Sequence, residues 1–501
     1  MKKIIALSSI AFLTTFAFAD TDMQKQINDL KIQLEKLEKA QETQDKQISK
    51  VNAQSAKDNI KFDVDFRTAY DNLQYKTVSG KNYSNNALYS NRLWLGMGYA
   101  PTEEMIFKGQ LGFNKAFGAS YGQRGTGFGF DTFDWVLNEN LTDDTLKVRE
   151  AYWLWMPTIG GLSTTFSVGR RPSTNGSLIN LRDDDKEKSP LGHVINMEFD
   201  GASASVKLDQ IMQGMSFKIC LGRGLTNATG WASEATKTLG APTGGSNQPN
   251  YTTDGNNLDN TDMLGFIFVP YNDGQYSINT TWYRGFSVPG LFATTIDGAT
   301  GAPKAYTMQS AGNMDGAAIS FMSNGIGDEI NDFLDETIVF ASFAYTQSHP
   351  DSISRTITTS PTTSMVVTSN SMLGSDESKT GYSYWLGMQI PNLTGGKFGL
   401  EFNHGSKDWR PFTYGEDTMI GSKIAVRGEA YEAYWTQPII KDVFSMQIRY
   451  TYLDYAYSGS NGFFGDGGTA INLNDKAALA ANGMDPVDTA SDLRVYFRYQ
   501  Y

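Results

Sequence analysis

The sequence predicts a transmembrane antiparallel β-barrel of about 16 strands (range about 14–18), preceded by a short α-helical coiled coil. Three features support this fold class: an export signal, a heptad repeat, and runs of two-residue alternation separated by short turns. The 501 residues include 50 Gly, 29 Phe, 25 Tyr and 9 Trp, yet only 40% are hydrophobic. This composition excludes a bundle of membrane helices and suits a sheet with one face in lipid and the other in water.

Residues 1–19 have the pattern of a cleavable signal peptide. A basic start at residues 2–3 precedes an apolar run over 4–16, and a small-x-small cleavage site follows at 17–19. The run is too short for a comfortable spanning helix, and no Cys stands at the cleavage point of a lipoprotein. Cys220 is the only cysteine, so no internal disulfide is expected, and a net charge of −12 argues against nucleic acid as a partner.

Residues 20–59 contain no Gly, Pro or aromatic residue and carry a heptad repeat. We predict a coiled-coil helix in the periplasm, because its apolar seam needs partner helices to bury it. Gln41 and Gln44 interrupt the seam and can fix its register. A single solvated helix is the alternative. The apolar seam residues are Ile27, Leu30, Leu34, Leu37, Ile48 and Val51.

From residue 60 to residue 501 the apolar period changes to two, which is typical of strands. In the run 493–501 every odd position is apolar or aromatic, and the even positions are Arg, Tyr, Arg and Gln. The run 60–67 alternates in the same way. A soluble antiparallel sheet alternates too, but a final strand that ends on an aromatic residue favours a membrane barrel.

Short turns that alternate with long polar loops set the expected strand count at about 16. Several of the turns are opened by Pro, which has no amide hydrogen and suits a place where pairing stops. The turns are expected at 101–104, 157–161, 210–214, 270–274, 325–332, 391–396 and 438–442. The long loops are expected at 71–87, 118–144, 172–195, 225–260, 289–313, 349–378, 406–422 and 457–490.

Four motifs follow one another along the chain: the heptad helix, Arg149-Glu150-Ala151-Tyr152, Val168-Gly169-Arg170-Arg171-Pro172, and the aromatic terminus. In this order they resemble an uncharacterised family of outer-membrane porins of Gram-negative bacteria, over most of the chain after the signal. The resemblance implies a channel in the outer membrane, often a homotrimer, with no established substrate. It also implies that the C-terminal strand is an assembly signal that the barrel-assembly machinery recognises. The aromatic residues of this signal are Phe497, Tyr499 and Tyr501.

The inward face of the alternating strands is predicted to be rich in cations. A barrel of this size encloses a water-filled channel, and rings of Arg or Lys favour anions. We therefore predict passive diffusion of small hydrophilic solutes or ions, with a lean towards anions; the alternative is that these cations only pair with wall groups. The inward basic residues are Lys61, Arg67, Arg92, Lys108, Lys147, Arg149, Arg171, Lys207, Lys218, Lys397, Arg449, Arg494 and Arg498. The inward acids are Asp63, Asp65, Asp209, Glu401 and Glu432.

An acidic cluster, Asp183-Asp184-Asp185-Lys186-Glu187, lies in the third long loop. This loop either folds into the lumen and faces basic wall residues across a constriction, or is a solvated surface loop; we favour the surface loop. Acidic outer loops can also bind divalent cations that bridge phosphates, so outer-membrane lipid and lipopolysaccharide are expected partners.

Catalysis is not predicted. His193, His349 and His404 lie far apart in the sequence without Asp or Ser at a telling spacing, and no His/Cys cluster has zinc-like spacing, so no metal or other cofactor is expected. The competing function is an outer-membrane adhesin or structural surface protein that uses the coil as a tether. Loop deletion separates the two functions, because lost adherence with unchanged conductance would favour the adhesin.

Overall fold

The computed structural model describes residues 60–118, 146–173, 175–229, 252–253, 259–299, 303–327, 330–360, 363–368, 373–413, 419–441, 443–459 and 469–501. The signal peptide and coiled coil expected at 1–19 and 20–59 lie outside these described residues. The described residues of 61–98 and 104–501 form one compact unit. In the described part of the chain, no helix has the length and apolar character needed to cross a membrane.

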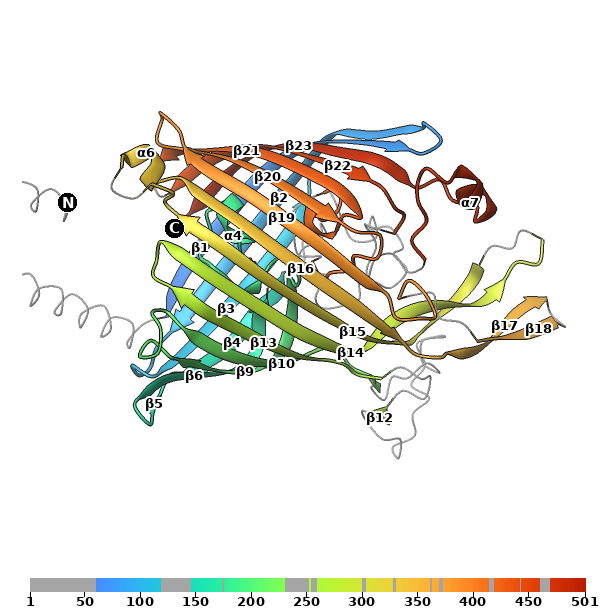
Figure 1. The fold of residues 1–501 in the computed structure, drawn as a ribbon, viewed down its shortest axis with the longest axis horizontal. Coiled ribbons are helices and arrows are strands. Elements are labelled where there is room, and N and C mark those ends of the chain that lie inside the picture. The colour runs from blue at the N-terminus through green and yellow to red at the C-terminus, as the bar shows by residue number, and fades with distance from the viewer. Residues whose placement is uncertain are drawn as a thin grey trace, which may run out of the picture. The chain divides into compact units, whose positions relative to one another are not determined.

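Within the described residues, sixteen long strands form a closed antiparallel barrel, which confirms the predicted fold class (Figure 1). The ring closes where the first long strand pairs with the last one. The barrel strands are β1 (Lys61–Thr77), β2 (Asn82–Tyr99), β3 (Met105–Ala116), β4 (Lys147–Trp155), β6 (Leu162–Ser173), β9 (Met197–Lys207), β10 (Ser216–Leu225), β13 (Thr261–Asn272), β14 (Tyr276–Ile296), β15 (Pro303–Asn324), β16 (Ile338–Pro350), β19 (Thr380–Pro391), β20 (Lys397–Gly405), β21 (Gly428–Ile440), β22 (Phe444–Tyr455) and β23 (Val487–Gln500).

Shorter elements lie in the connections. The short strands are β5 (Thr158–Ile159), β7 (Gly176–Ser177), β8 (Lys188–Leu191), β11 (Ala228–Thr229), β12 (Thr252–Thr253), β17 (Ser354–Ser360) and β18 (Thr363–Thr368). The helices are α4 (Ile179–Asp183), α6 (Asp332–Asp335), α7 (Lys476–Ala481) and the 3-10 turn η2 (Lys423–Ala425). The turn with α6 and the C-terminus lie at one end of the barrel, and the β17–β18 hairpin and α7 lie at the other (Figure 1).

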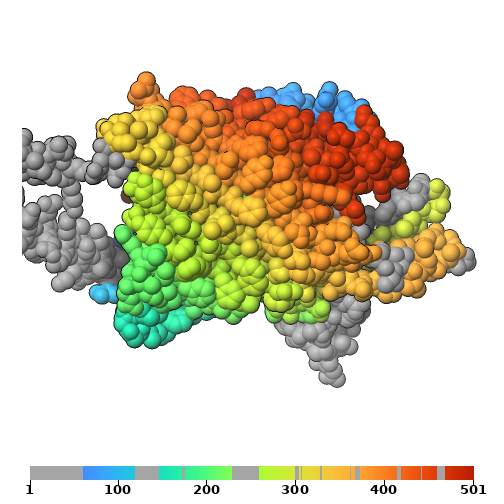
Figure 2. Space-filling view, viewed as in Figure 1, coloured from blue at the N-terminus to red at the C-terminus, as the bar shows by residue number. Residues whose placement is uncertain are grey.

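The two faces of β23 show why the sequence alternates. Phe497 and Tyr499 are 44% and 40% exposed on the outside of the barrel. Arg494, Tyr496 and Arg498, at the alternate positions of the same strand, are at most 3% exposed and point inward. Aromatic rings that face water are not stabilised by the hydrophobic effect, whereas rings that face the hydrocarbon core of a membrane are favourable. The space-filling view shows the strands of one side as an unbroken wall (Figure 2).

Two prolines lie inside strands rather than opening the turns predicted at 270–274 and 438–442. Pro270 belongs to β13 and Pro438 to β21, and each lies at a shift in strand register. A bulge is one of the few places where a strand tolerates a residue without an amide hydrogen. The chain therefore turns a few residues later than the prolines indicate.

The outer loops contain more strand than expected. The predicted loop 71–87 is largely the paired ends of β1 and β2, and the predicted loop 289–313 is largely β14 and β15. The predicted loop 349–378 contains the β17–β18 hairpin. Beyond the lipid both faces of a strand meet water, so backbone pairing continues where the apolar alternation has ended.

Candidate functional site: the loops inside the barrel

Residues 175–196, which we call the lumen loop, connect β6 to β9 through the interior of the barrel. Asn279 of β14 donates a hydrogen bond to Ser177 at 3.2 Å. On another part of the wall, Gln389 of β19 donates to the carbonyl of Leu181 at 3.0 Å. The solvated surface loop that we favoured from the sequence is therefore wrong.

The lumen loop folds inward because it carries an apolar face of its own. Leu178, Leu191 and Val194 are 0–2% exposed and belong to a core that also contains Tyr283 and Trp385 of the wall. Burial of each such side chain contributes about 1.5–3 kcal/mol. In the sequence, the acidic cluster at 183–187 lies between these apolar residues and favours the interpretation of the segment as a solvated loop.

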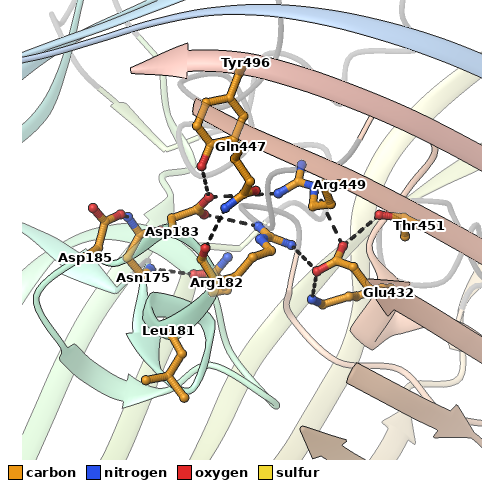
Figure 3. Close-up of polar contacts among 12 residues, drawn as sticks. Asn175, Leu181, Arg182, Asp183, Asp185, Glu432, Gln447, Arg449, Thr451 and Tyr496 are labelled. Carbon is orange, nitrogen blue, oxygen red and sulfur yellow. Dashed lines mark hydrogen bonds and ion pairs between the residues drawn. The ribbon is translucent and has the colours of Figure 1, made fainter. Parts of the chain in front are cut away.

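Helix α4 places two charged side chains of the lumen loop against β21–β23 (Figure 3). Arg182 lies 3.4 Å from the carboxylate of Glu432. Asp183 accepts a hydrogen bond from the hydroxyl of Tyr496 at 3.2 Å. The backbone is held as well, because Gln447 donates to the carbonyl of Arg182 at 2.8 Å. The helix is therefore fixed by side-chain and main-chain contacts to one side of the wall.

Glu432 is the centre of this network. Its side chain is fully buried and accepts hydrogen bonds from Lys423 and, at 2.7 Å, from Thr451. Arg449 lies 3.9 Å from the same carboxylate (Figure 3). A buried carboxylate is tolerated only when cations and donors surround it, and Glu432 has both.

Arg498 forms a second set of contacts with the lumen loop. Its guanidinium donates to Asp65 at 2.9 and 2.5 Å, to the carbonyl of Asp183 at 2.5 Å and to Asp185 at 2.5 Å. Arg92 reaches the same Asp65 carboxylate at 3.2 Å. The loop thus meets the barrel at the seam where the first and last strands pair.

A second loop, residues 406–427, also enters the barrel and is described over 406–413 and 419–427. It pairs with the lumen loop, where Phe412 donates its backbone amide to Val194 at 3.1 Å. Trp409 donates its indole N–H to the carbonyl of Ile424 at 2.7 Å. Two loops that are far apart in the chain therefore support each other inside the wall.

His193 of the lumen loop is fully buried between two hydroxyl groups. Its ring nitrogens lie 2.8 Å from the Ser342 hydroxyl and 2.9 Å from that of Ser383. The rings of Trp385 and Trp409 stand edge-on, each with its centroid 5.7 Å from that of His193. Burial lowers the pKa of His193 to about 3, and a hydrogen bond to Asn403 opposes the shift.

We expect this histidine to make the barrel less stable in mild acid. Above pH ~6.5 His193 is neutral in both the folded and the unfolded chain. Between pH ~6.5 and 3 only the unfolded chain takes up the proton, so the free energy of unfolding falls by about 1.4 kcal/mol per pH unit. Urea unfolding at pH 7.5 and 5.5 measures this loss of stability. The variant His193→Gln should no longer show the loss, whereas the control His404→Gln, which changes an outward-facing residue, should still show it. An equal loss in wild type and His193→Gln would contradict the assignment.

The predicted inward residues fall into three groups. The buried group contains Asp65, Arg67, Arg92, Arg149, Glu401, Glu432, Arg449, Arg494 and Arg498. The half-buried group contains Lys147, Arg171, Lys218 and Lys397. The exposed group contains Lys61, Asp63, Lys108 and Lys207 on strands and Asp209 in a turn. Of the residues assigned to the assembly signal, Phe497 and Tyr499 face outward and Tyr501 follows β23 at 82% exposure.

Many of the buried cations contact carboxylates. Arg494 lies 2.5 Å from Asp71, and Arg149 lies 3.2 Å from Glu198. The register of β3 and β4 shifts at Arg149, so that the adjacent Glu150 also turns inward and accepts a hydrogen bond from Lys188 at 2.5 Å. Strict alternation would place only one of the neighbours Arg149 and Glu150 in the lumen, and the bulge explains why both lie there.

Sequence reasoning missed several residues of the interior, including Arg182, His193, Lys423 and Trp409. One signal was available in the run 380–391. Its outward residues are Tyr382, Tyr384 and Leu386, so Trp385 falls on the inward face. A large aromatic side chain on a water-facing position indicates that another segment packs inside the barrel.

These features define a transmembrane β-barrel with an apolar exterior and a charged interior, which two loops of the described residues occupy. The chain belongs to the family described as "Protein of unknown function (DUF3373)", which it matches over residues 82–501. The predicted membership of an uncharacterised family is thereby confirmed. No curated protein matches the chain.

The chain is similar in fold to several solved structures. The high-pH structure of OprB from Pseudomonas putida is 9% identical, with 90% of this chain and 96% of that chain covered and a TM-score of 0.44. OmpF of Salmonella typhi in complex with daunomycin is 10% identical, with 89% and 99% covered and a TM-score of 0.43. A mutant of the Rh. blastica porin is 9% identical, with 88% and 100% covered and a TM-score of 0.40.

Proposed function

We propose that this protein is an outer-membrane channel for passive diffusion of small hydrophilic solutes, narrowed by the lumen loop. The observation that carries the proposal is the reversal of polarity across the wall. Outward positions such as Phe343 and Leu386 are 50% and 46% exposed, whereas inward positions such as Arg494 and Gln447 are charged or polar. A closed barrel with a lipid-facing exterior and a polar interior is the architecture of a water-filled pore.

The pore that we propose is narrow. Inward side chains such as Arg149, Gln447 and Arg494 are completely buried. In a wide aqueous lumen these side chains would meet water. We infer a low conductance and a size limit set by the lumen loop rather than by the barrel wall.

We propose that the weak preference for anions arises at the end of the barrel where the short turns lie. Lys61, Lys108 and Lys207 are exposed on inward strand positions near the turns and have no ion pair within the described residues. The buried arginines contribute less to selectivity, because carboxylates such as Asp65 and Asp71 offset much of their charge. Exposed cations at a pore mouth raise the local concentration of anions.

Two measurements on folded protein test these proposals. Liposomes containing the barrel should swell faster in a small sugar than in a disaccharide; equal swelling of protein-containing and protein-free liposomes would contradict passive diffusion. A zero-current potential across a salt gradient should show weak anion preference. The triple variant Lys61→Gln, Lys108→Gln, Lys207→Gln should show no anion preference, whereas the outer-loop control Lys476→Gln should keep it. Cation preference in the wild type would contradict the proposed anion preference.

The proposal also includes parts that rest on the sequence alone. Residues 1–19 direct export, residues 20–59 form a periplasmic coil, and the barrel assembles as a homotrimer. The barrel-assembly machinery, membrane lipid and lipopolysaccharide are the remaining proposed partners.

A further inference from the structure

A cavity lies between the returning half of the lumen loop and the wall formed by β6, β9, β10, β13 and β14. Its volume is ≈ 60 Å³, and a single water needs about 10–15 Å³ on this measure. It therefore has room for a few waters or a compact organic group. Its lining is mostly apolar and includes Ile195, Phe199, Cys220 and Tyr283, with Arg171, Ser189 and Thr281 as polar members.

Two cations border this cavity and have no carboxylate partner within the described residues. Arg171 is part of the lining and donates to the hydroxyl of Ser203, and Lys218 donates to the hydroxyl of Ser189, another lining residue, at 2.8 Å. Lys218 stands two residues before Cys220 on the same face of β10, so it lies on the inward side of the wall beside the cavity. The arrangement differs from that of Arg494, which contacts a carboxylate.

Arg171 and Lys218 are half-buried, and a cation that loses part of its hydration is stabilised by a counter-ion. Serine hydroxyls satisfy donors but do not neutralise charge. An anion held by both side chains would neutralise charge, and the apolar remainder of the cavity suits a small organic body rather than a bare inorganic ion. A carboxylate accepts from both a guanidinium and an ammonium group.

We propose that the cavity binds a small organic carboxylate, with the anionic group between Arg171 and Lys218 and a compact apolar body against Phe199, Cys220 and Tyr283. The site lies behind the lumen loop and is separate from the exposed lysines of the pore mouth. Binding there does not depend on the channel proposal, because it can be measured in a barrel that conducts nothing.

A glycine of the wall provides a way to fill the cavity. A Cβ added to Gly265 would lie 3.4 Å from the carbonyl oxygen of Trp282 and 3.8 Å from Cβ of Cys220 and of Tyr283, which are ordinary contacts. Gly265→Ala is therefore expected to fold and leave most of the space open. Gly265→Leu places a larger apolar group in the cavity and is expected to exclude the ligand.

Calorimetric titration of the full-length barrel in lipid nanodiscs tests the site. Propionate is the probe, because its five heavy atoms suit the small volume of the cavity, and 1-propanol is the neutral molecule of similar size. We expect propionate to bind the wild type and Gly265→Ala, and to bind the double variant Arg171→Gln, Lys218→Gln at least about tenfold more weakly. The control Arg223→Gln, on the outward face of β10 and paired with Asp262, should bind like the wild type.

Three outcomes would overturn the proposal: no propionate binding to a heat-modifiable wild-type barrel, equal affinity for propionate and 1-propanol, or undiminished binding by the double variant or by Gly265→Leu. A barrel that conducts but fails these tests would defeat this site and leave the channel proposal standing.

The single cysteine localises the ligand independently. Cys220 lines the cavity and is the only thiol in the chain, so its modification by methyl methanethiosulfonate can be followed by mass spectrometry without other cysteines. Propionate at a saturating concentration should slow the modification of wild-type protein and leave its rate unchanged in the double variant. Bound propionate that leaves the wild-type rate unaltered would place the anion elsewhere and contradict the assignment.

Discussion

Replacement of residues 178–191 by a short Gly-Ser linker is expected to raise the single-channel conductance several-fold. The deletion removes α4, β8 and the apolar side chains that occupy the interior. The remaining ends are already adjacent, because the amide of Gly192 donates to the carbonyl of Ser177 at 3.2 Å. A few residues can therefore close the gap without displacing β6 or β9.

The matched control removes residues 354–368, the β17–β18 hairpin, which extends from the barrel at the end opposite the C-terminus (Figure 1). This deletion should leave the conductance near the wild-type value. Both variants must shift on gels when heated, as a folded barrel does. If the lumen-loop deletion conducts no more than wild type, then the loop does not limit the pore.

Glu432→Gln is expected to destabilise the barrel by about 3–5 kcal/mol, the usual range when one member of a buried charged cluster is neutralised. Glutamine keeps the size of the side chain, so the loss reflects charge rather than a cavity. The Glu432 carboxylate lies within 4 Å of Lys423, Arg182 and Arg449, and the substitution removes the negative charge from all three cations at once. The midpoint of urea unfolding measures the effect.

Glu429→Gln is the control, since Glu429 stands on the same strand, is only half-buried and bonds the Tyr431 hydroxyl on the outer face. Its expected effect is about 0–1 kcal/mol. Equal stability of Glu432→Gln and Glu429→Gln would contradict the central role of Glu432.

The wall of the barrel could be predicted because alternation is a local property of each strand. A residue such as Phe497 meets lipid and the next residue, Arg498, meets the interior, and this difference repeats along the run 493–501. The strand count followed from the same signal together with the short turns. Strand ends were less accurate, because pairing continues beyond the lipid where alternation stops.

The interior could not be predicted because its contacts join distant parts of the chain. Arg494 meets Asp71 across 423 positions of sequence, and Asp183 meets Tyr496 across 313. No local pattern indicates which carboxylate a given cation meets. The fate of the lumen loop depended in the same way on partners such as Gln389 and Trp385, which belong to strands on the other side of the lumen.

Planar-bilayer recording of the purified, heat-modifiable wild-type barrel beside its lumen-loop deletion tests the central claim most directly. We predict small, discrete conductance steps from the wild type and larger steps from the deletion variant in the same salt solution. Absence of discrete steps from both folded proteins would contradict the conclusion that this barrel is a channel narrowed by its own loop.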